Sequence, residues 1–375
     1  MIRILHIITT LEHGGAEKNL ISISSNLDKN EFNQSIISLT TSSKKYSDIA
    51  ELNNVQLINL NINNFITALV GIYKICKFLN QYKPHIVQTW LYHADILGLI
   101  IKILYKKYKV IWNIRCSHLA VSDISYTTRI IRYILSVRSQ KVDGIIFNSK
   151  AGLVEHRKLG MFNENSHIIP NGFNLEEFKA DKKIREKIRE GLQINQDVFV
   201  CGMVARYDPL KNHDHFIRAA ALLNKIYGKK IIFLLIGVNI NWNNKKLVNS
   251  INHENLKDKF HLLGQRNDIN DILKIIDCLV LTSITEGFPN VIGEAMASEV
   301  PCVSTCVGDV VSIMGNRKNI IKINDVADLV SKVNDIINLS TDEKLELGVN
   351  LRKRIENNFS IVSTMKKYRM MYSNV

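Results

Sequence analysis

Three patterns that would place the chain in a common class of protein are missing from its sequence. None of the six cysteines forms a Cys-x-x-Cys pair, which argues against a structural zinc site. No Gly-x-Gly-x-x-Gly follows a strand-like run, which argues against a dinucleotide-dependent oxidoreductase. The longest stretch without a charged residue, 52–73, contains seven Asn or Gln residues, so it cannot span a bilayer. Any membrane contact is therefore expected to be peripheral.

The cysteines that are present lie mostly in apolar, strand-like runs such as 198–204 and 278–281. A thiol in such a run packs as a small buried hydrophobe, and free thiols are typical of a reducing compartment. Cys302 and Cys306 lack the second Cys or His pair that a zinc site needs. We therefore expect a cytoplasmic protein without a cysteine-bound metal.

Basic residues are in excess, with 49 Lys and Arg against 35 Asp and Glu. Most of the excess lies in 1–172, which holds 20 basic and 11 acidic residues. Two clusters, 102–109 and 129–141, interleave basic and apolar residues and predict basic amphipathic helices. Such helices suit an anionic membrane, where each basic residue contributes about 1 kcal/mol; solvated lysine-rich faces are the alternative. We expect peripheral contact with the inner face of the cell membrane, and no motif indicates nucleic acid.

The length of 375 residues exceeds what one hydrophobic core usually supports, so two domains are expected. Apolar runs of strand length alternate with helical patterns in both halves, which predicts an α/β protein with parallel sheets covered by helices. The predicted strands are 2–8, 34–39, 86–89, 110–114 and 144–147 in the first half, and 198–204, 231–236, 260–263, 278–281 and 302–304 in the second.

Turn-forming residues mark the junction between the halves. Pro170 fixes its own backbone angle, while Asn171 and Gly172 tolerate positive φ. The charged segment 181–191 predicts a linker helix, and from residue 325 onward the pattern is helical. We expect one domain over 1–172, a second over 173–358, and a final helix over 359–375 with Ser360 as its N-cap.

Two loops of the second half place charged residues at the carboxyl ends of predicted strands, the edge where parallel sheets bind ligands. Arg206 and Lys211 lie five positions apart, so both cations can converge on one diphosphate. Glu286 lies in a loop with Gly and Pro, and Asn290 is expected to cap a helix that carries Glu294. A helix N-terminus suits phosphate, and carboxylates suit sugar hydroxyls. Solvated cations and a capped helix with incidental acids are the alternatives.

Two further loops carry weaker signals. Gly14 and Gly15 follow the first predicted strand, and a helix that begins at Gly15 would direct its positive end toward a ligand. Arg266 lies in a loop after the strand 260–263, where backbone groups could contact a nucleobase. An ordinary turn explains each of these loops equally well when it is taken alone.

Taken together, these residues resemble a known family of enzymes. The run from Glu286 to Glu294 resembles the E-x7-E signature of the family-4 retaining glycosyltransferases. The Arg206 and Lys211 pair, the early Gly-Gly-Ala-Glu and the Ile-Pro-Asn-Gly junction accompany it in family order over nearly the whole chain. The resemblance implies an α/β GT-B fold, with two facing Rossmann-like domains and a C-terminal helix that crosses back onto the N-terminal domain.

The resemblance also implies roles for these residues. Arg206 and Lys211 would bind the diphosphate of a nucleotide sugar, Glu286 would contact the sugar hydroxyls, and Glu294 would contact the ribose. The other implied donor-binding residues are Gly14, Gly15, Arg266, Gly287, Phe288, Pro289 and Asn290. The implied substrates are a UDP-hexose or UDP-N-acetylhexosamine and a lipid-linked or cell-surface glycan. No metal or other cofactor is expected, because the Arg/Lys pair takes the role that a metal has in other transferases.

The sequence departs from the family pattern at one position, and it does not decide which residue is the active-site histidine of the family. Glu299 stands where the family usually has a glycine, which puts the tight packing behind the donor helix in doubt. The N-terminal active-site histidine of the family corresponds to His93 or His118, and Arg115 is a further candidate on the acceptor side. Retention implies front-face attack assisted by the departing phosphate, without a glutamate nucleophile. A nucleotide-sugar epimerase of the same build and an inactive membrane-surface scaffold are the alternative functions.

Overall fold

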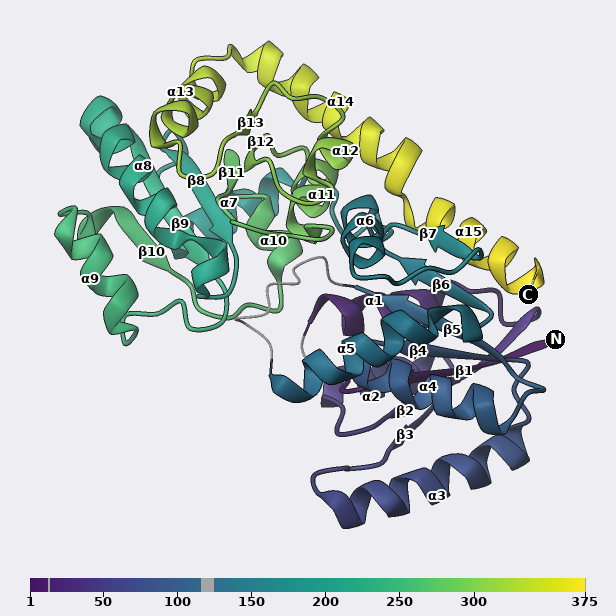
Figure 1. Cartoon of the computed structure of the whole chain (residues 1–375). Helices are drawn as coiled ribbons and strands as arrows, with labels where there is room; N and C mark the ends of the chain where they lie inside the picture. Colours follow the sequence, from purple (N-terminus) through teal and green to yellow (C-terminus); the bar gives the residue numbers. More distant parts are fainter. Residues whose placement is uncertain (13, 116–124, 375) are drawn as a thin grey trace. The chain divides into compact units, whose positions relative to one another are not determined.

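The structure, a computed structural model, describes residues 1–12, 14–115 and 125–374. The chain divides into two compact units (Figure 1). Unit 1 consists of Met1–Gly172 together with Ile361–Val375, and unit 2 consists of Phe173–Ser360. Among the described residues, no helix combines the length and apolarity that crossing a bilayer requires.

Unit 1 contains a seven-stranded sheet in the order β3-β2-β1-β4-β5-β6-β7, in which every neighbouring pair is parallel. Its strands are β1 (Ile2–Ile8), β2 (Phe32–Ser38), β3 (Gln56–Asn59), β4 (Ile86–Trp90), β5 (Lys109–Ile114), β6 (Gly144–Phe147) and β7 (Ser166–Ile168). The central strands are buried along almost their whole length, as parallel strands covered on both faces must be.

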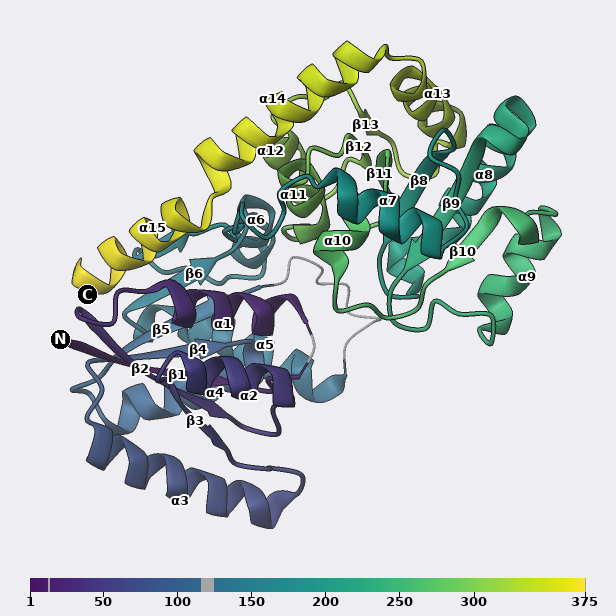
Figure 2. The same cartoon turned by 180° about the vertical axis from the view of Figure 1, so that it is seen from behind.

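Helices cover both faces of this sheet, and each face has its own apolar core. The helices are α1 (Gly15–Asn26), α2 (Lys44–Leu52), α3 (Phe65–Tyr82), α4 (Tyr92–Leu104), α5 (Tyr126–Arg138), α6 (Lys150–Lys158) and α15 (Ile361–Asn374). Side chains of α1, α2 and α15 pack with Ile4 and Ile8 of β1. Side chains of α3, α4 and α5 pack with Leu5 and Ile7 of the same strand. These two residues point to the opposite face from Ile4 and Ile8, because successive side chains of a strand alternate between its faces. The two views from opposite sides show these two layers (Figures 1 and 2).

Unit 2 contains a six-stranded parallel sheet in the order β10-β9-β8-β11-β12-β13. Its strands are β8 (Phe199–Val204), β9 (Ile231–Ile236), β10 (Phe260–Leu262), β11 (Cys278–Leu281), β12 (Cys302–Thr305) and β13 (Ile320–Ile321). Its helices are α7 (Lys182–Gly191), α8 (His213–Tyr227), α9 (Lys245–His253), α10 (Ile269–Leu273), α11 (Asn290–Ala297), α12 (Val310–Met314), α13 (Val326–Ile337) and α14 (Thr341–Phe359).

Helix α7 differs from the predicted linker helix, because it is anchored to the sheet of unit 2. The guanidinium of Arg189 is fully buried and donates to Asp277 Oδ2 at 2.7 Å. Arg185 donates to the other oxygen of the same carboxylate at 2.6 Å. Asp277 directly precedes β11 and also accepts from the Val200 amide. The charges that suggested a solvated linker therefore form a half-buried cluster that fixes α7.

The chain passes between the units twice, at 172–173 and at 360–361. The Phe173 amide donates to the Phe359 carbonyl at 2.9 Å. On the unit 1 side, a Cβ on Gly172 would lie 2.8 Å from the Cα of Ile361, so only glycine allows this approach. The two passages therefore lie side by side.

Candidate functional site

The loops after β8 and β11 meet at one ion pair in unit 2. Lys211 Nζ lies 2.6 Å from Glu286 Oε1. The hydroxyl of Ser283 donates to the same oxygen, also at 2.6 Å. Because β8 and β11 are parallel neighbours, their carboxyl ends share one edge of the sheet. The structure thus brings together one predicted cation and one predicted acid from loops 75 positions apart.

A short 3₁₀ turn, Pro209–Lys211, sets the position of Lys211. The side chain of Asp208 caps this turn by accepting from the Leu210 amide at 2.9 Å. At the other end of the turn, the hydroxyl of Thr282 lies 3.1 Å from the Lys211 carbonyl oxygen. The backbone on both sides of Lys211 is therefore held, while its side chain reaches Glu286.

Arg206 is bound by Asp208 and not by Glu286. Its Nε and Nη2 donate to Asp208 Oδ2 at 3.0 and 2.9 Å, and its side chain is 61% exposed. Burial alone would raise the Asp208 pKa, but hydrogen bonds from the Leu210 amide and from Arg206 outweigh it and hold the pKa below its ordinary value. Asp208 is therefore an anion that joins Arg206 to the turn of Lys211.

The loop that carries Glu286 is supported from behind by the loop after β12. The hydroxyl of Thr305 donates to the Ser283 carbonyl at 2.6 Å, and the Asp309 amide donates to the Gly287 carbonyl at 2.9 Å. Gly308 has φ +53°, and a Cβ there would lie 2.6 Å from the Glu286 carbonyl oxygen. This contact requires glycine. These supporting residues were not predicted. The only feature of the sequence that indicates them is a glycine, Gly308, shortly after a strand.

Helix α11 begins one residue earlier than a cap by Asn290 would require. Pro289 occupies the N-cap position, no side chain caps the helix, and Asn290 is its first residue. The prediction that Asn290 caps α11 is therefore wrong, because the proline already has the extended backbone of a cap. The ring of Phe288 is buried and stacks on Phe173, with ring centroids 6.2 Å apart. A Cβ on Gly293 would overlap the Phe173 ring, so this glycine lets Phe173 lie over α11.

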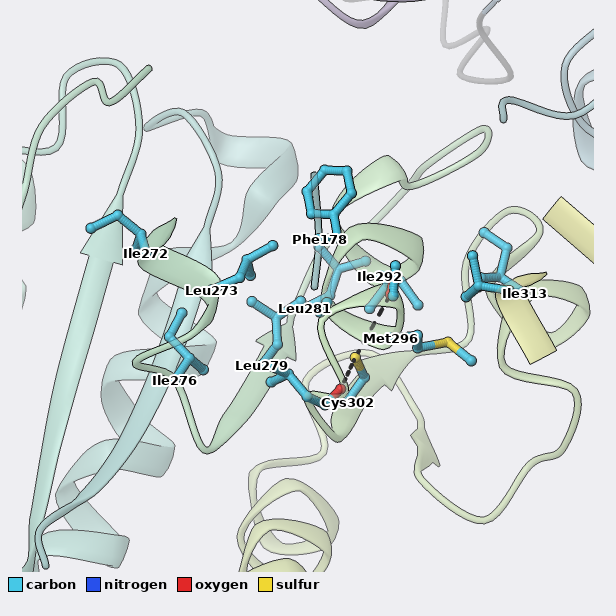
Figure 3. Close-up of a cluster of buried hydrophobic side chains, with 14 of the residues drawn as sticks. Phe178, Ile272, Leu273, Ile276, Leu279, Leu281, Ile292, Met296, Cys302 and Ile313 are labelled. Carbon is cyan, nitrogen blue, oxygen red and sulfur yellow. Dashed lines mark hydrogen bonds between the residues drawn. The ribbon is translucent and has the colours of Figure 1, made fainter. Parts of the chain in front are cut away.

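An apolar cluster behind α11 fixes the helix, as Figure 3 shows. Ile292 and Met296 pack there with Leu281 of β11 and Cys302 of β12. The Cys302 thiol lies 3.9 Å from the Ile292 carbonyl oxygen. Glu294, on the same helix, is only 8% exposed. The second predicted acid thus lies at the start of the second turn of α11, where little of its side chain is exposed.

Glu299 follows α11 with φ +64°, a left-handed conformation that favours glycine. Its carbonyl oxygen would lie 2.9 Å from a Cβ on Gly348 of α14. The tight packing that the glutamate put in doubt is therefore present. The cost is a strained backbone at Glu299, in the range of about 1–2 kcal/mol for such residues.

Arg266 lies further along the same sheet edge, after β10. Its Nε donates to Asp268 Oδ1 at 2.8 Å, and its Nη2 donates to the other oxygen at 2.5 Å. A hollow of about 440 Å³ is lined by Tyr207 and by four asparagines, Asn239, Asn241, Asn243 and Asn244. This amide-rich hollow after β8 and β9 was not predicted.

In unit 1, the predicted glycines begin α1. Gly14 precedes the helix, no side chain caps it, and Gly15 is its first residue. Glu17 in the first turn is buried, and a Cβ on Gly14 would lie 3.0 Å from the Glu17 carboxyl carbon. Gly14 therefore gives the Glu17 side chain its room.

The other predicted residues of unit 1 differ in their surroundings. His93 is exposed in the first turn of α4, next to Leu91, which has φ +72°. Arg115 donates to the Tyr368 hydroxyl at 2.7 Å and to Asn171, and its guanidinium lies 4.7 Å from the Trp90 ring centroid. Arg115 therefore ties α15 to the sheet. His118 lies outside the described residues.

Two family models match the chain and together cover most of it. The model of the glycosyl transferases group 1 matches residues 184–358, and the model of Glycosyltransferase Family 4 matches residues 13–177. The chain resembles, over its full length, the structure of Anabaena Alr3699/HepE in complex with UDP, with a TM-score of 0.85 and 20% identity, and that chain is covered completely.

Two of the curated relatives are named for substrates that contain diphospho-undecaprenol. The UDP-Gal:alpha-D-GlcNAc-diphosphoundecaprenol alpha-1,3-galactosyltransferase of Escherichia coli is 34% identical over 220 residues, 55% of this chain and 53% of that enzyme. The N,N'-diacetylbacillosaminyl-diphospho-undecaprenol alpha-1,3-N-acetylgalactosaminyltransferase of Campylobacter jejuni is 24% identical over 77% of this chain and 76% of that enzyme. The chain thus spans about half the length of the first relative and three quarters of the second. With both family models and the fold in agreement, the chain belongs to the family-4 glycosyltransferases and has the GT-B fold.

Proposed function

We propose that this protein is a retaining glycosyltransferase that moves a hexose or N-acetylhexosamine from a UDP-sugar to a lipid-linked glycan acceptor. The observation that carries the proposal is the contact of Lys211 with Glu286 at the ligand edge of the unit 2 sheet. The relatives named for UDP-Gal and for diphospho-undecaprenol substrates support the donor and acceptor classes. The epimerase alternative gains no support from these relatives.

In this proposal the cations stabilise the leaving group. As the bond to the sugar breaks, negative charge builds up on the diphosphate, and fixed cations stabilise that charge without reorganisation. Lys211 is already fixed by its turn, whereas Arg206 must exchange Asp208 for phosphate oxygens. The uncapped amides of α11 face the same edge and supply further donors for an anion. The two cations supply the charge that a metal would bring, so we propose no metal cofactor.

Glu286 is proposed to bind sugar hydroxyls and not to attack the sugar. Its Oε1 already accepts hydrogen bonds from Lys211 and Ser283, and a carboxylate oxygen with two donors is a poor nucleophile. This arrangement supports front-face attack by the acceptor, assisted by the departing phosphate. Glu294 is proposed to bind the ribose hydroxyls, and His93 the acceptor.

The lipid-linked acceptor leads us to propose a peripheral position on the inner, cytoplasmic face of the cell membrane. The predicted basic clusters lie at the end of α4 and along α5, both in unit 1. Lys106, Lys107, Lys109, Arg138 and Lys141 are exposed there. Basic side chains at a surface are attracted to anionic lipid.

The test of the proposed function is a transfer assay with a panel of UDP-sugars and a short-chain lipid diphosphate acceptor. We expect an α-linked product from an α-linked donor, seen by NMR of the anomeric proton. A β-linked product would overturn retention, and an epimerised donor formed without acceptor would favour the epimerase.

The matched variants are Lys211→Ala and Lys246→Ala. We expect Lys211→Ala to lower kcat by at least about tenfold, because a fixed cation at the leaving group is lost. Lys246 is an exposed lysine on α9 of the same unit, and its replacement should leave kcat unchanged. Equal rates for the two variants would remove Lys211 from the proposed mechanism.

A further inference from the structure

The two helical layers of unit 1 differ sharply in what they show to solvent. Fourteen large apolar side chains are exposed on the outer layer formed by α3, α4 and α5, against three on α1, α2 and α15. Six belong to α3, three to α4 and five to α5, and they are Phe65, Ile66, Leu69, Val70, Ile72, Tyr73, Ile100, Ile103, Leu104, Tyr126, Ile130, Tyr133, Ile134 and Val137. Figure 1 shows α4 and α5 in front of the sheet, and Figure 2, from the opposite side, shows α1 and α2 there.

Helix α5 buries polar side chains and exposes apolar ones, unlike a helix that faces water. It buries Arg132 and Ser136 against the protein, together with Leu135. Its outward positions hold Tyr126, Tyr133 and Val137, which are 75%, 72% and 61% exposed. A surface helix normally buries its apolar stripe, so this outward stripe indicates a partner other than water.

Helix α3 shows the same feature in its first half. The positions 65, 66, 69, 70 and 73 follow helical spacing and form one apolar stripe on its outer side. Phe65 and Ile66 are 77% and 73% exposed. Helix α3 carries no acidic residue, and its only basic residues, Lys74 and Lys77, follow the stripe.

The exposed charged side chains of these three helices are all basic. In the three helices, which are described in full, Asp95 is the one acidic residue, and it is completely buried. The exposed basic residues in and next to the three helices are Lys74, Lys77, Lys83, Lys106, Lys107, Lys109, Arg138 and Lys141. Of these, Lys109 lies 3.6 Å from the half-buried carboxylate of Asp143. On the opposite layer the exposed charges are mixed, because α2 exposes Asp48 and Glu51 together with Lys44 and Lys45.

We infer that the outer side of α3, α4 and α5, here called the α3–α5 face, docks onto an anionic lipid bilayer. Its apolar side chains enter the boundary between headgroups and acyl chains, and its lysines and arginines contact the lipid phosphates. A second copy of the chain fits this face poorly, because an isologous contact would bring two basic surfaces together. The inference deepens the proposed function, since it rests on the lipid-linked acceptor and names the surface that brings unit 1 to the bilayer.

The experiment is sedimentation of the full chain with vesicles of phosphatidylcholine alone or with added phosphatidylglycerol. We expect binding to the anionic vesicles and weak binding to the neutral ones. Ile66→Asn/Leu69→Asn removes part of the apolar stripe, and Lys106→Gln/Lys107→Gln removes charge. Each double variant should weaken binding by about tenfold or more. Val362→Asn/Met370→Asn, on exposed positions of α15, is the matched control and should bind as the unchanged protein does.

Three results would overturn the inference: no binding of the unchanged protein to anionic vesicles, equal losses in the control variant, or equal binding by all variants. A concentration-dependent dimer that Ile66→Asn/Leu69→Asn abolishes would assign the face to self-association. Transfer to a water-soluble acceptor separates this inference from the proposed function. Vesicle binding without transfer would support the α3–α5 face as a membrane surface and contradict the proposed function. Transfer without vesicle binding would support the proposed function and contradict the membrane surface.

Discussion

At the residue scale, Asp208 holds Arg206 and the turn of Lys211 at the same time. One of its oxygens accepts from the Leu210 amide and the other from Arg206. A diphosphate that binds both cations has to displace this carboxylate from Arg206. The charge of Arg206 is therefore balanced by an acid of the same loop, a feature that the spacing of Arg206 and Lys211 alone did not reveal.

This arrangement predicts that Asp208→Asn increases the affinity for UDP. The asparagine oxygen can still cap the turn, whereas the ion pair with the exposed Arg206 is lost. Exposed pairs contribute about 1 kcal/mol at most, so the affinity should rise by up to about fivefold. Titration calorimetry measures the change, with Asp208→Ala as a second variant that also loses the cap. Weaker UDP binding by Asp208→Asn would show that Asp208 does not compete with the donor.

The strained backbone at Glu299 leads to a second residue-scale prediction. Glu299→Gly should raise the free energy of unfolding by about 1 kcal/mol, because glycine adopts positive φ without steric cost. Glu254→Gly at the end of α9, where φ is −89°, is the control and should not stabilise. Urea unfolding of both variants checks the difference, and a destabilised Glu299→Gly would contradict this reading of the backbone.

Sequence reasoning at this scale found the residues with distinctive chemistry and missed those that support them. Lys211 and Glu286 were recognisable because charged residues after strands mark ligand edges. Ser283 and Thr282 look like ordinary strand-end residues. The contact of Thr282 with the Lys211 carbonyl joins residues 71 positions apart, so only the folded chain reveals it.

At the scale of elements, all ten predicted strands are present, with ends that differ by at most two residues. Their apolar runs are long because both faces of each sheet are covered. The strands β3, β7 and β13 were missed. They are four, three and two residues long and lie at sheet edges, so their apolar runs are too short to be recognised in the sequence.

A buried hydroxyl group is one of the contacts that hold the C-terminal helix α15. Tyr368 accepts from Asn113 at 3.2 Å and from Arg115 at 2.7 Å, and it is fully buried. Tyr368→Phe would leave both donors unsatisfied, so we expect a loss of about 1–3 kcal/mol in the free energy of unfolding. Tyr73→Phe on the exposed side of α3 is the control. Thermal unfolding that is equal for the two variants would show that the hydroxyl does not hold α15.

At the scale of the whole molecule, buried histidines should make stability depend on pH. Burial lowers the pKa of His6, His156 and His213 from 6.5 to about 4. The folded state therefore keeps them neutral, while the unfolded chain takes up protons below pH 6.5. Stability should be fully present above pH 6.5 and fall as the pH decreases toward 4, by up to about 3 kcal/mol for each histidine.

His156 offers a direct check of this pH dependence. Its Nδ1 donates to the Gly152 carbonyl at 2.7 Å, so its Nε2 must accept from the Tyr92 hydroxyl at 2.6 Å. His156→Gln removes the titrating group, and urea unfolding across this pH range should then give a shallower slope. His253→Gln, at an exposed site, should keep the original slope. Identical slopes for all three proteins would contradict the assignment.

The central claim is that the donor diphosphate binds where Lys211 meets Glu286 in unit 2. Titration calorimetry of UDP with the unchanged protein, Lys211→Ala and Lys246→Ala tests it most directly. We expect at least about tenfold weaker binding for Lys211→Ala, from the loss of a charge-assisted contact, and unchanged binding for Lys246→Ala. Equal affinity of all three proteins for UDP would contradict it.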